Sequence, residues 1–276
     1  MKSKKLLSIF MIIGAVILIA GIVITVIGFA TGGSVKIRED WWTDVENLNH
    51  SASGEVSSVT IKSSFGDVEI VAGSQNRVDV KNYPKDMLKI SEVNGELRII
   101  DKNIDEKWYK NSINLSKTPK ITVTLSNSEL DRIDIDNGAG SVKISGLSVK
   151  TVKNSLGAGD LEAINLEADY YDIDSGAGNV TFKNATVGTL TASLGAGDFS
   201  FQGDINSSCK VDNGAGSVRL DLAGPESKYR FKCSQGMGSV SVNGYNSNGV
   251  TDLEISSGSV LIDIDSGVGD VTIKTK

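Results

Sequence analysis

The side chains that most often carry catalysis are scarce in this chain and stand far apart. His50 is the only histidine, so a Ser-His-Asp or Cys-His system would have to use it, and no motif near it in sequence suggests a nucleophile. There is no Walker loop and no Gly-x-Ser-x-Gly elbow, and a two-histidine zinc motif is impossible. The sequence therefore predicts no catalytic residue, no cofactor and no metal site.

Paired carboxylates are the one arrangement left that could do chemistry. Asp134 with Asp136, and Asp263 with Asp265, could flank a glycosidic bond as acid and base. Outward acids are also what an acidic surface carries in any case. We therefore expect a protein that is not an enzyme, with a glycan-cleaving or glycan-binding surface as the alternative.

A Gly-x-Gly turn is the strongest pattern in the chain. Its first glycine recurs every nineteen residues through five copies, then at Gly236 and, after a degenerate copy near Ser256 and Gly258, at Gly267. A fixed period of about 20 residues is typical of stacked repeats, and glycine permits the positive φ of a tight corner. The pairs that we expect to form structural turns are Gly138 and Gly140, Gly157 and Gly159, Gly176 and Gly178, Gly195 and Gly197, Gly214 and Gly216, Gly236 and Gly238, and Gly267 and Gly269.

Short alternating strands must position these turns. Relative to the first glycine, apolar residues fall at positions −5, −3, +4 and +6, a period of two that indicates strands with one buried face. Stacked in parallel about 4.8 Å apart, the coils would align their inward side chains in columns. One such column would be Val142, Leu161, Val180, Phe199, Val218 and Val240. The sequence thus predicts an all-β, single-chain β-solenoid of about 19-residue coils.

Aspartate alternates across the turn from one coil to the next. At position −2 the order is Asp136, Ser155, Asp174, Ser193 and Asp212, and at position +3 it is Ser141, Asp160, Asn179, Asp198 and Ser217. This separates like charges by two strand spacings. One interpretation is a row of oxygen ligands for Ca²⁺; the other, which we favour, is turn chemistry in which these side chains accept hydrogen bonds from the backbone.

The N-terminal leader is apolar enough to cross a bilayer. Residues 6–30 contain no charged side chain and would span roughly 37 Å as a helix. Lys2, Lys4 and Lys5 precede it, which predicts an N-terminus inside the cell and a C-terminal domain outside. A cleaved signal peptide is the alternative, although the apolar stretch is long for one.

Four regions follow from these patterns. We expect a cytoplasmic tip and transmembrane anchor at residues 1–30 and a juxtamembrane linker or cap at 31–55, where Trp41 and Trp42 would lie at the membrane or over the solenoid end. Irregular early coils would fill residues 56–130 and the regular solenoid residues 131–276. Segments 59–70 and 88–99 both fit the coil template, and residues 101–118 are expected to form a surface loop.

The charge balance limits the classes of binding partner, and the positions of the two cysteines limit disulfide pairing. Residues 31–276 carry 25 Lys and Arg against 34 Asp and Glu, an acidic balance that argues against binding nucleic acid through a basic patch and would tolerate cationic partners. Cys209 and Cys233 are expected to point inward on adjacent coils, with Cys209 over Phe231 and Val211 over Cys233. That places the thiols diagonally, at or beyond disulfide reach, so we expect two free thiols rather than a bridge.

The recurring turns NGAGSV, LGAGDL, SGAGNV and LGAGDF, with an early Phe65-Gly66-Asp67-Val68 unit, resemble the bacterial "putative adhesin" family of β-strand-repeat proteins. The lysine-led helix adds a resemblance to anchored proteins of Lia-type envelope-stress operons. The resemblance implies an envelope protein and supplies no functional residues.

We therefore expect a membrane-anchored cell-envelope protein with an extracellular acidic β-solenoid, acting as an adhesin or envelope-stress scaffold on a cell-wall polymer or another envelope protein. The alternatives are a carbohydrate-binding or carbohydrate-cleaving β-helix, for which Trp108, Tyr109 and Tyr245 are candidate contacts, and a scaffold that polymerises end to end.

Overall fold

The computed structural model describes residues 45–102, 118–246, 252–256 and 258–276. They lie in one compact unit, Trp42–Lys276. The predicted anchor, the tryptophan pair and most of the predicted surface loop, including Trp108 and Tyr109, fall outside the described residues. Within those residues no helix is long and apolar enough to span a membrane.

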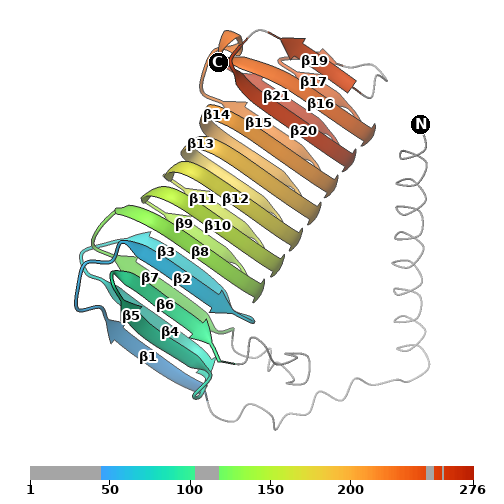
Figure 1. The fold of residues 1–276 in the computed structure, drawn as a ribbon. Helices are drawn as coiled ribbons and strands as arrows, with labels where there is room; N and C mark the ends of the chain where they lie inside the picture. Colours follow the sequence, from blue (N-terminus) through green and yellow to red (C-terminus); the bar gives the residue numbers. More distant parts are fainter. Residues whose placement is uncertain (1–44, 103–117, 247–251, 257) are drawn as a thin grey trace, which may run out of the picture. The chain divides into compact units, whose positions relative to one another are not determined.

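The middle of the unit is an all-β stack of coils that follow one another in chain order (Figure 1). Every neighbouring pair of strands here is parallel, and corresponding residues nineteen apart face each other, as Val152 does Tyr171. The strands are β8 (Glu129–Ala139), β9 (Val142–Ser145), β10 (Ser148–Ala158), β11 (Leu161–Ile164), β12 (Glu167–Ala177), β13 (Val180–Ala196), β14 (Phe199–Ala215) and β15 (Val218–Leu222). The predicted solenoid is confirmed at this level.

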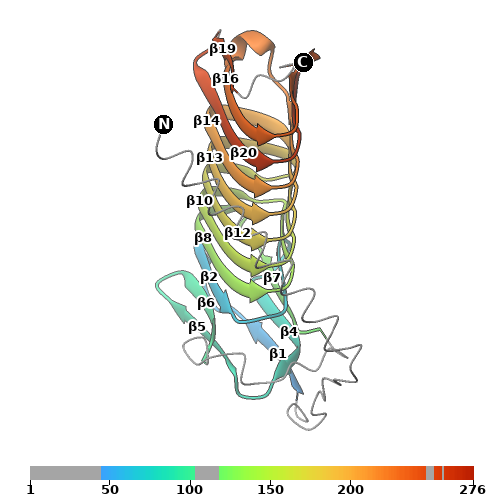
Figure 2. The same cartoon turned by 90° about the vertical axis from the view of Figure 1, so that its right-hand side faces the viewer.

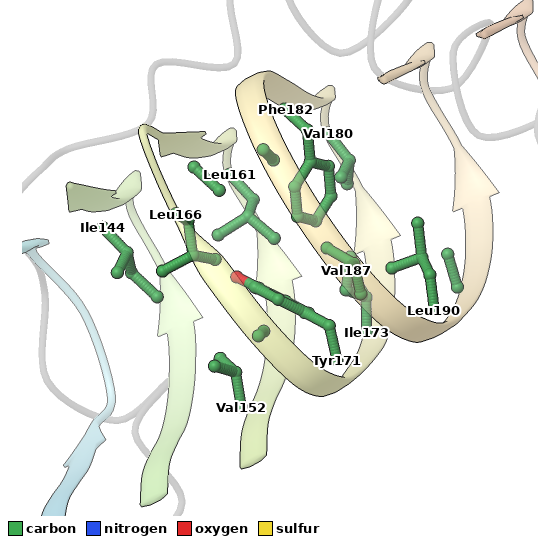
Figure 3. Packing of buried hydrophobic residues seen from close by; sticks show 14 of the residues in the cluster. Ile144, Val152, Leu161, Leu166, Tyr171, Ile173, Val180, Phe182, Val187 and Leu190 are labelled. Carbon is green, nitrogen blue, oxygen red and sulfur yellow. The ribbon is translucent and has the colours of Figure 1, made fainter. Parts of the chain in front are cut away.

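The interior of the stack is filled by the columns that the sequence predicts. Tyr171 and Ile173 on β12, with Val180 and Phe182 on β13, point into the space enclosed by their coil, as Figure 3 shows. All four are at most 1% exposed. Phe182 packs edge-on against Tyr171, with ring centroids 4.9 Å apart, and lies 5.4 Å from the Phe201 ring. Each coil thus buries its apolar face only against its neighbours.

The C-terminal end departs from chain order. The last coil, β20 (Val260–Val268) with β21 (Val271–Thr275), lies between the coil of β14 and β15 and that of β16 (Tyr229–Met237) and β17 (Val240–Val242), as Figure 1 shows. The predicted column is therefore wrong at one step, because Val271 separates Val218 from Val240.

The cysteine prediction needs the same correction. Cys209 faces Ile262, and Ile262 faces Phe231, so the two cysteine-bearing coils are not adjacent. Both thiols are buried and free. Burial raises the pKa of each to about 12, with the Asp263 carboxylate adding to the rise at Cys233, so neither is a nucleophile at neutral pH.

At the N-terminal end, too, one coil lies out of chain order between two others. The first coil, β2 (Ser58–Ser63) with β3 (Asp67–Ala72), lies between β8 and β9 on one side and β6 (Glu96–Asp101) and β7 (Lys120–Leu125) on the other. At both ends, a coil built from interior segments of the chain covers the coil nearest the terminus. Figure 2 shows the stack from the side, with β2 directly beneath β8.

Antiparallel strands close both ends. β4 (Arg77–Pro84) pairs with β7 and with β1 (Val45–Ser51), and β5 (Leu88–Val93) pairs with β6. At the other end β18 (Tyr245–Asn246) pairs with β17, and β19 (Asp252–Ser256) with β16, while the 3-10 turn η2 (Glu226–Lys228) precedes β16.

Two predicted coils are thereby corrected. The segment 88–99 is an antiparallel hairpin turning at Asn94 and Gly95, both with positive φ, and the segment near Ser256 is the antiparallel strand β19.

Candidate functional site

The glycine pairs form a line of corners along the stack. The second glycine of each pair has a φ between +124° and +142°, which other residues rarely adopt. A Cβ on the first glycine, as at Gly157, would collide with the carbonyl oxygen of the glycine one coil away. Buried amides brace three of these corners, since Asn213 Nδ2 donates to the carbonyl of Gly216 at 2.9 Å, Asn137 Nδ2 to that of Gly140 at 3.1 Å, and Gln235 Nε2 to that of Gly269. The corners are therefore structural.

The alternating side chains at position +3 bind backbone, which supports turn chemistry over a Ca²⁺ row. Asp160 Oδ1 accepts from the Asn179 N–H at 2.8 Å, Asn179 Oδ1 from Asp198 N–H at 3.0 Å and Asp198 Oδ1 from Ser217 N–H at 2.8 Å. Each carboxylate or amide thus ties its coil to the next. Within the described residues, no group of three or more His, Cys, Asp or Glu side chains is arranged to hold a metal ion.

The carboxylate pairs predicted from sequence lie in different surroundings. Asp134 is paired with Arg132 at 2.7 Å on the outer face of β8, where Asp136 is also exposed. Asp263 and Asp265 line a groove of about 630 Å³ whose other lining residues come from β14, β16 and β19. Lys232 Nζ lies 3.5 Å from Asp263 there, so one carboxylate of the pair is ion-paired.

His50 and Tyr245 lie at the capped ends. His50 Nε2 is 2.6 Å from Glu92 Oε1, a contact that joins β1 to β5. Glu92 also accepts from the Ser53 N–H, and the hydrogen bond from His50, followed by that backbone bond, holds the pKa of Glu92 below its usual range. Tyr245 is 69% exposed on the β17–β18 hairpin.

A second groove, unforeseen from the sequence, runs lengthwise across the middle coils. It holds about 640 Å³ and crosses β8, β10, β12, β13 and β14, with Glu55 and Ser57 at one end. The coils that it crosses are successive rungs, so four strand spacings, roughly 19 Å, separate its β8 and β14 ends. Its lining residues are Glu55, Ser57, Asn127, Glu129, Leu130, Asp131, Ser148, Val149, Lys150, Glu167, Ala168, Asp169, Thr186, Gly188, Asn206 and Ser207.

A repeated bend in the strands creates this groove. Along β10, Val149 and Thr151 pair with both neighbours while Lys150 is skipped, and Asp131 and Asp169 are skipped at the equivalent places. The skipped residue leaves the ladder as in a β-bulge, and the strand changes direction there. Two outward columns result, one on each side of a buried floor formed by Leu130, Val149 and Ala168.

The groove is acidic. Its lining holds five carboxylates, Glu55, Glu129, Asp131, Glu167 and Asp169, and a single ammonium, Lys150. Lys150 Nζ lies 2.7 Å from Asp131 Oδ1, and this hydrogen bond raises the pKa of Lys150. Glu129 and Glu167 are exposed, and their carboxylates form no ion pair or hydrogen bond with other described residues.

A lysine from elsewhere in the chain reaches the far end of the groove. Lys228, on η2, places Nζ 3.0 Å from Oδ1 of the lining residue Asn206 and 2.6 Å from Asp204 Oδ1. Burial would raise the pKa of Asp204, but the hydrogen bonds from Lys228 and Tyr229 outweigh it and hold that pKa below its ordinary value. The groove end therefore already binds an ammonium group.

The sequence did not predict the groove because the glycine period identifies only the inward positions of each coil. Glu129 and Glu167 are outward, so the period says nothing about them. A signal was present: position −7 reads Asp131, Lys150 and Asp169, opposite charges in succession on neighbouring coils.

The family model described as Toastrack DUF4097 matches residues 53–274, a range that contains the coil stack and leaves out the capping strand β1. The chain belongs to the Toastrack DUF4097 family. The resemblance to adhesin-type β-strand-repeat proteins is thereby confirmed at the level of the family. No curated protein matches the chain.

The chain is similar to several solved structures at low sequence identity. A "putative cell adhesion protein" from Clostridium sporogenes is 17% identical, with 84% of this chain and 100% of that chain covered and a TM-score of 0.37. A "putative adhesin" from Bacteroides fragilis is 13% identical, with 84% and 98% covered and a TM-score of 0.45. A "putative lipid binding protein" from Parabacteroides distasonis is 15% identical, with 85% and 97% covered and a TM-score of 0.36.

Proposed function

We propose that this chain is a non-enzymatic binding protein of the bacterial cell envelope, anchored by its leader with the Toastrack domain outside the cell. The uncharged segment 6–30 behind Lys2, Lys4 and Lys5 supports the anchor and its orientation. The adhesin-type family supports a binding role, and the anchored resemblance to envelope-stress proteins supports the location. The domain would act as an adhesin or as a scaffold for another envelope component.

The lengthwise groove is the observation that carries the binding role. It crosses five strands whose corners are fixed by glycine φ values and whose coils are tied by the position +3 hydrogen bonds. A rigid surface of this kind loses little conformational entropy on binding. Its exposed carboxylates are held in fixed columns for a partner to meet.

Protease shaving of intact cells tests the location. External protease should remove the Toastrack domain and leave a membrane-bound N-terminal fragment, with a cytoplasmic marker protein intact as the control. A full-length protein that is protected in intact cells and cleaved only after lysis would contradict the proposed location.

A carbohydrate-directed function is the second candidate, and the groove at Asp263 and Asp265 favours it specifically. Its volume of about 630 Å³ is sufficient for part of a sugar chain. Binding and release of reducing ends should be measured on isolated wall glycans. Loss of either signal in Asp263→Asn with Asp265→Asn, and not in Asp134→Asn with Asp136→Asn, would establish this candidate in place of the first.

End-to-end polymerisation finds less support. Antiparallel strands cap both ends of the stack, so another copy would not meet an open coil. Sedimentation of the full chain in detergent should show a species that does not grow with concentration.

A further inference from the structure

We propose that the lengthwise groove binds an extended basic peptide segment with Lys or Arg at every third residue. This inference rests on the proposed binding function and names the class of partner for the same surface. The partner is a segment of another protein, and the groove recognises it by charge and spacing.

Charge sets the class of ligand. Five carboxylates against one ammonium make the lining strongly negative, and Lys150 is already held by Asp131. Glu129 and Glu167 have no partner among the described residues, so they are available to a cation arriving from solvent. An anionic polymer would be repelled by the same lining.

The contact made by Lys228 is an independent observation of the ligand chemistry. Lys228 belongs to η2, in the connection between β15 and β16, and its ammonium binds Asp204 at 2.6 Å and the lining residue Asn206 at 3.0 Å. Asp204 faces Thr186, which continues the column of Glu129, Ser148 and Glu167. A lysine side chain thus occupies one end of this column in the native chain, and a partner's basic side chains would occupy the open positions.

Spacing sets the conformation of the peptide. Glu129 and Glu167 both face Ser148 from opposite sides, so their coils are two strand spacings apart, about 9.6 Å. A polyproline II helix rises about 3.1 Å per residue and returns to the same face every three residues, about 9.3 Å. A β-strand returns to the same face every two residues, about 6.6 Å, and does not match. A polyproline II segment with a basic residue at every third position therefore aligns with both glutamates.

The floor explains why charge dominates recognition. Leu130, Val149 and Ala168 are 3%, 3% and 7% exposed, so they offer a shallow apolar surface and no deep pocket. Prolines of the peptide would lie on this floor. We expect modest affinity that falls steeply with added salt.

The test is titration calorimetry of the full chain in detergent with the synthetic peptide (Lys-Pro-Pro)4. Wild-type protein should bind it, and Glu129→Gln with Glu167→Gln should weaken binding at least fivefold. The matched control Asp136→Asn with Asp174→Asn removes two exposed carboxylates outside the groove and should leave the affinity within twofold. Thermal unfolding of each variant should be unchanged, which separates lost binding from lost folding.

Two further peptides test charge and spacing separately. (Glu-Pro-Pro)4 should not bind, and (Lys-Pro-Pro-Pro)4, which keeps four lysines but spaces them out of register with the glutamates, should bind at least threefold more weakly. Equal binding by the double glutamine variant and the wild-type protein, or by the acidic and basic peptides, would overturn the inference.

The outcome is distinguishable from failure of the proposed function. A protein removed by external protease that ignores (Lys-Pro-Pro)4 keeps its envelope role and loses this ligand class. A protein that binds the peptide in the groove but is protected in intact cells keeps the ligand class and loses the proposed location.

Discussion

The middle of the Toastrack domain and its two ends are built from similar strands, but the strands are ordered and paired differently. From β8 to β14 each coil lies on the coil that precedes it in the chain, and all pairs are parallel. At each end the terminal coil moves one place inward, a coil of interior segments covers it, and antiparallel strands close the edge. The difference shows that the glycine period fixes what a coil is and leaves open which coil lies beside which.

Outward charges help to set the order at the C-terminal end. In position −4, Lys210 faces Asp263 and Asp263 faces Lys232, so the inserted coil separates two lysines that chain order would place together. At position +3, Asp270 Oδ1 accepts from the Ser239 N–H at 2.9 Å, restoring the alternation that Ser217 and Ser239 would interrupt. At position −2 the inserted coil brings two like charges together, because Asp212 faces Asp265. Lys210 lies 2.7 Å from Asp212 and reduces the repulsion between the two carboxylates.

Truncating a buried aromatic in the middle should have the largest effect. Phe182→Ala removes a wholly buried ring that contacts Tyr171, Phe199 and Phe201, and should cost about 4 kcal/mol of unfolding free energy. Leu88→Ala, at a capping hairpin, should cost about 2 kcal/mol. Urea unfolding measures both, and equal losses would remove the distinction between middle and end.

Replacing a glycine by alanine should have the second-largest effect on stability, and the loss should be greater in the middle than at the end. Gly178→Ala should cost about 3 kcal/mol, because the new Cβ meets the Gly159 carbonyl oxygen and φ is +136°. Gly244→Ala, in the end hairpin with φ +83° and open space around it, should cost about 1 kcal/mol. Thermal unfolding compares them, and a milder effect at Gly178 would contradict tight corner stacking.

A pH-dependent brace at the C-terminal end should have a smaller effect. The Asp204 carboxylate binds Lys228 and Tyr229, and its pKa is depressed, so its stabilisation is present above the ordinary Asp pKa of about 3.9 and is lost as pH falls through the lower folded pKa. Asp204→Asn should cost about 1.5 kcal/mol at pH 7, reduced by the partial exposure of the pair.

Stability curves from pH 7 to pH 2 check this sign. The wild-type and Asp204→Asn proteins should converge as the pH falls below the ordinary Asp pKa and through the lower pKa of folded Asp204. A difference that grows as the pH falls would contradict it.

Reversing a charge in the inserted coil should have the smallest effect. Asp263→Lys places three lysines in succession with Lys210 and Lys232 and should cost about 1 kcal/mol, whereas Asp263→Asn should cost about half of that. The loss should shrink in high salt. An effect of Asp263→Lys no larger than that of Asp263→Asn would show that the charge column does not help to order the coils.

The sequence predicted the interior of the middle because that interior depends on local alternation alone. Ile133, Ile135, Val142 and Ile144 are buried in the columns expected of them. The hairpin of β5 and β6 was missed although Asn94-Gly95 between alternating strands is a strong hairpin signal. The coil template predicted a coil in this segment, whereas the Asn-Gly turn indicates the hairpin that the structure has.

The inserted coil was missed because apolar columns are interchangeable between coils. Val271 and Ile273 fit beside Val218 and Leu220 as well as Val240 and Val242 do. Only the outward polar residues distinguish one coil from another. In the two coils that are consecutive in sequence here, Lys210 and Lys232 occupy the same position, as do Ser217 and Ser239. Such repeats mark the place at which another coil belongs. The groove likewise depends on outward residues that the apolar period does not address.

Disulfide trapping of the coil order tests the central claim most directly. Arg219 faces Thr272, and Thr272 faces Ser241, so Arg219→Cys with Thr272→Cys should form a bridge under mild oxidation without loss of stability. Arg219→Cys with Ser241→Cys, two coils apart, should remain reduced under the same conditions. A bridge in the second pair and none in the first would show that the coils follow chain order to the end and would contradict the account.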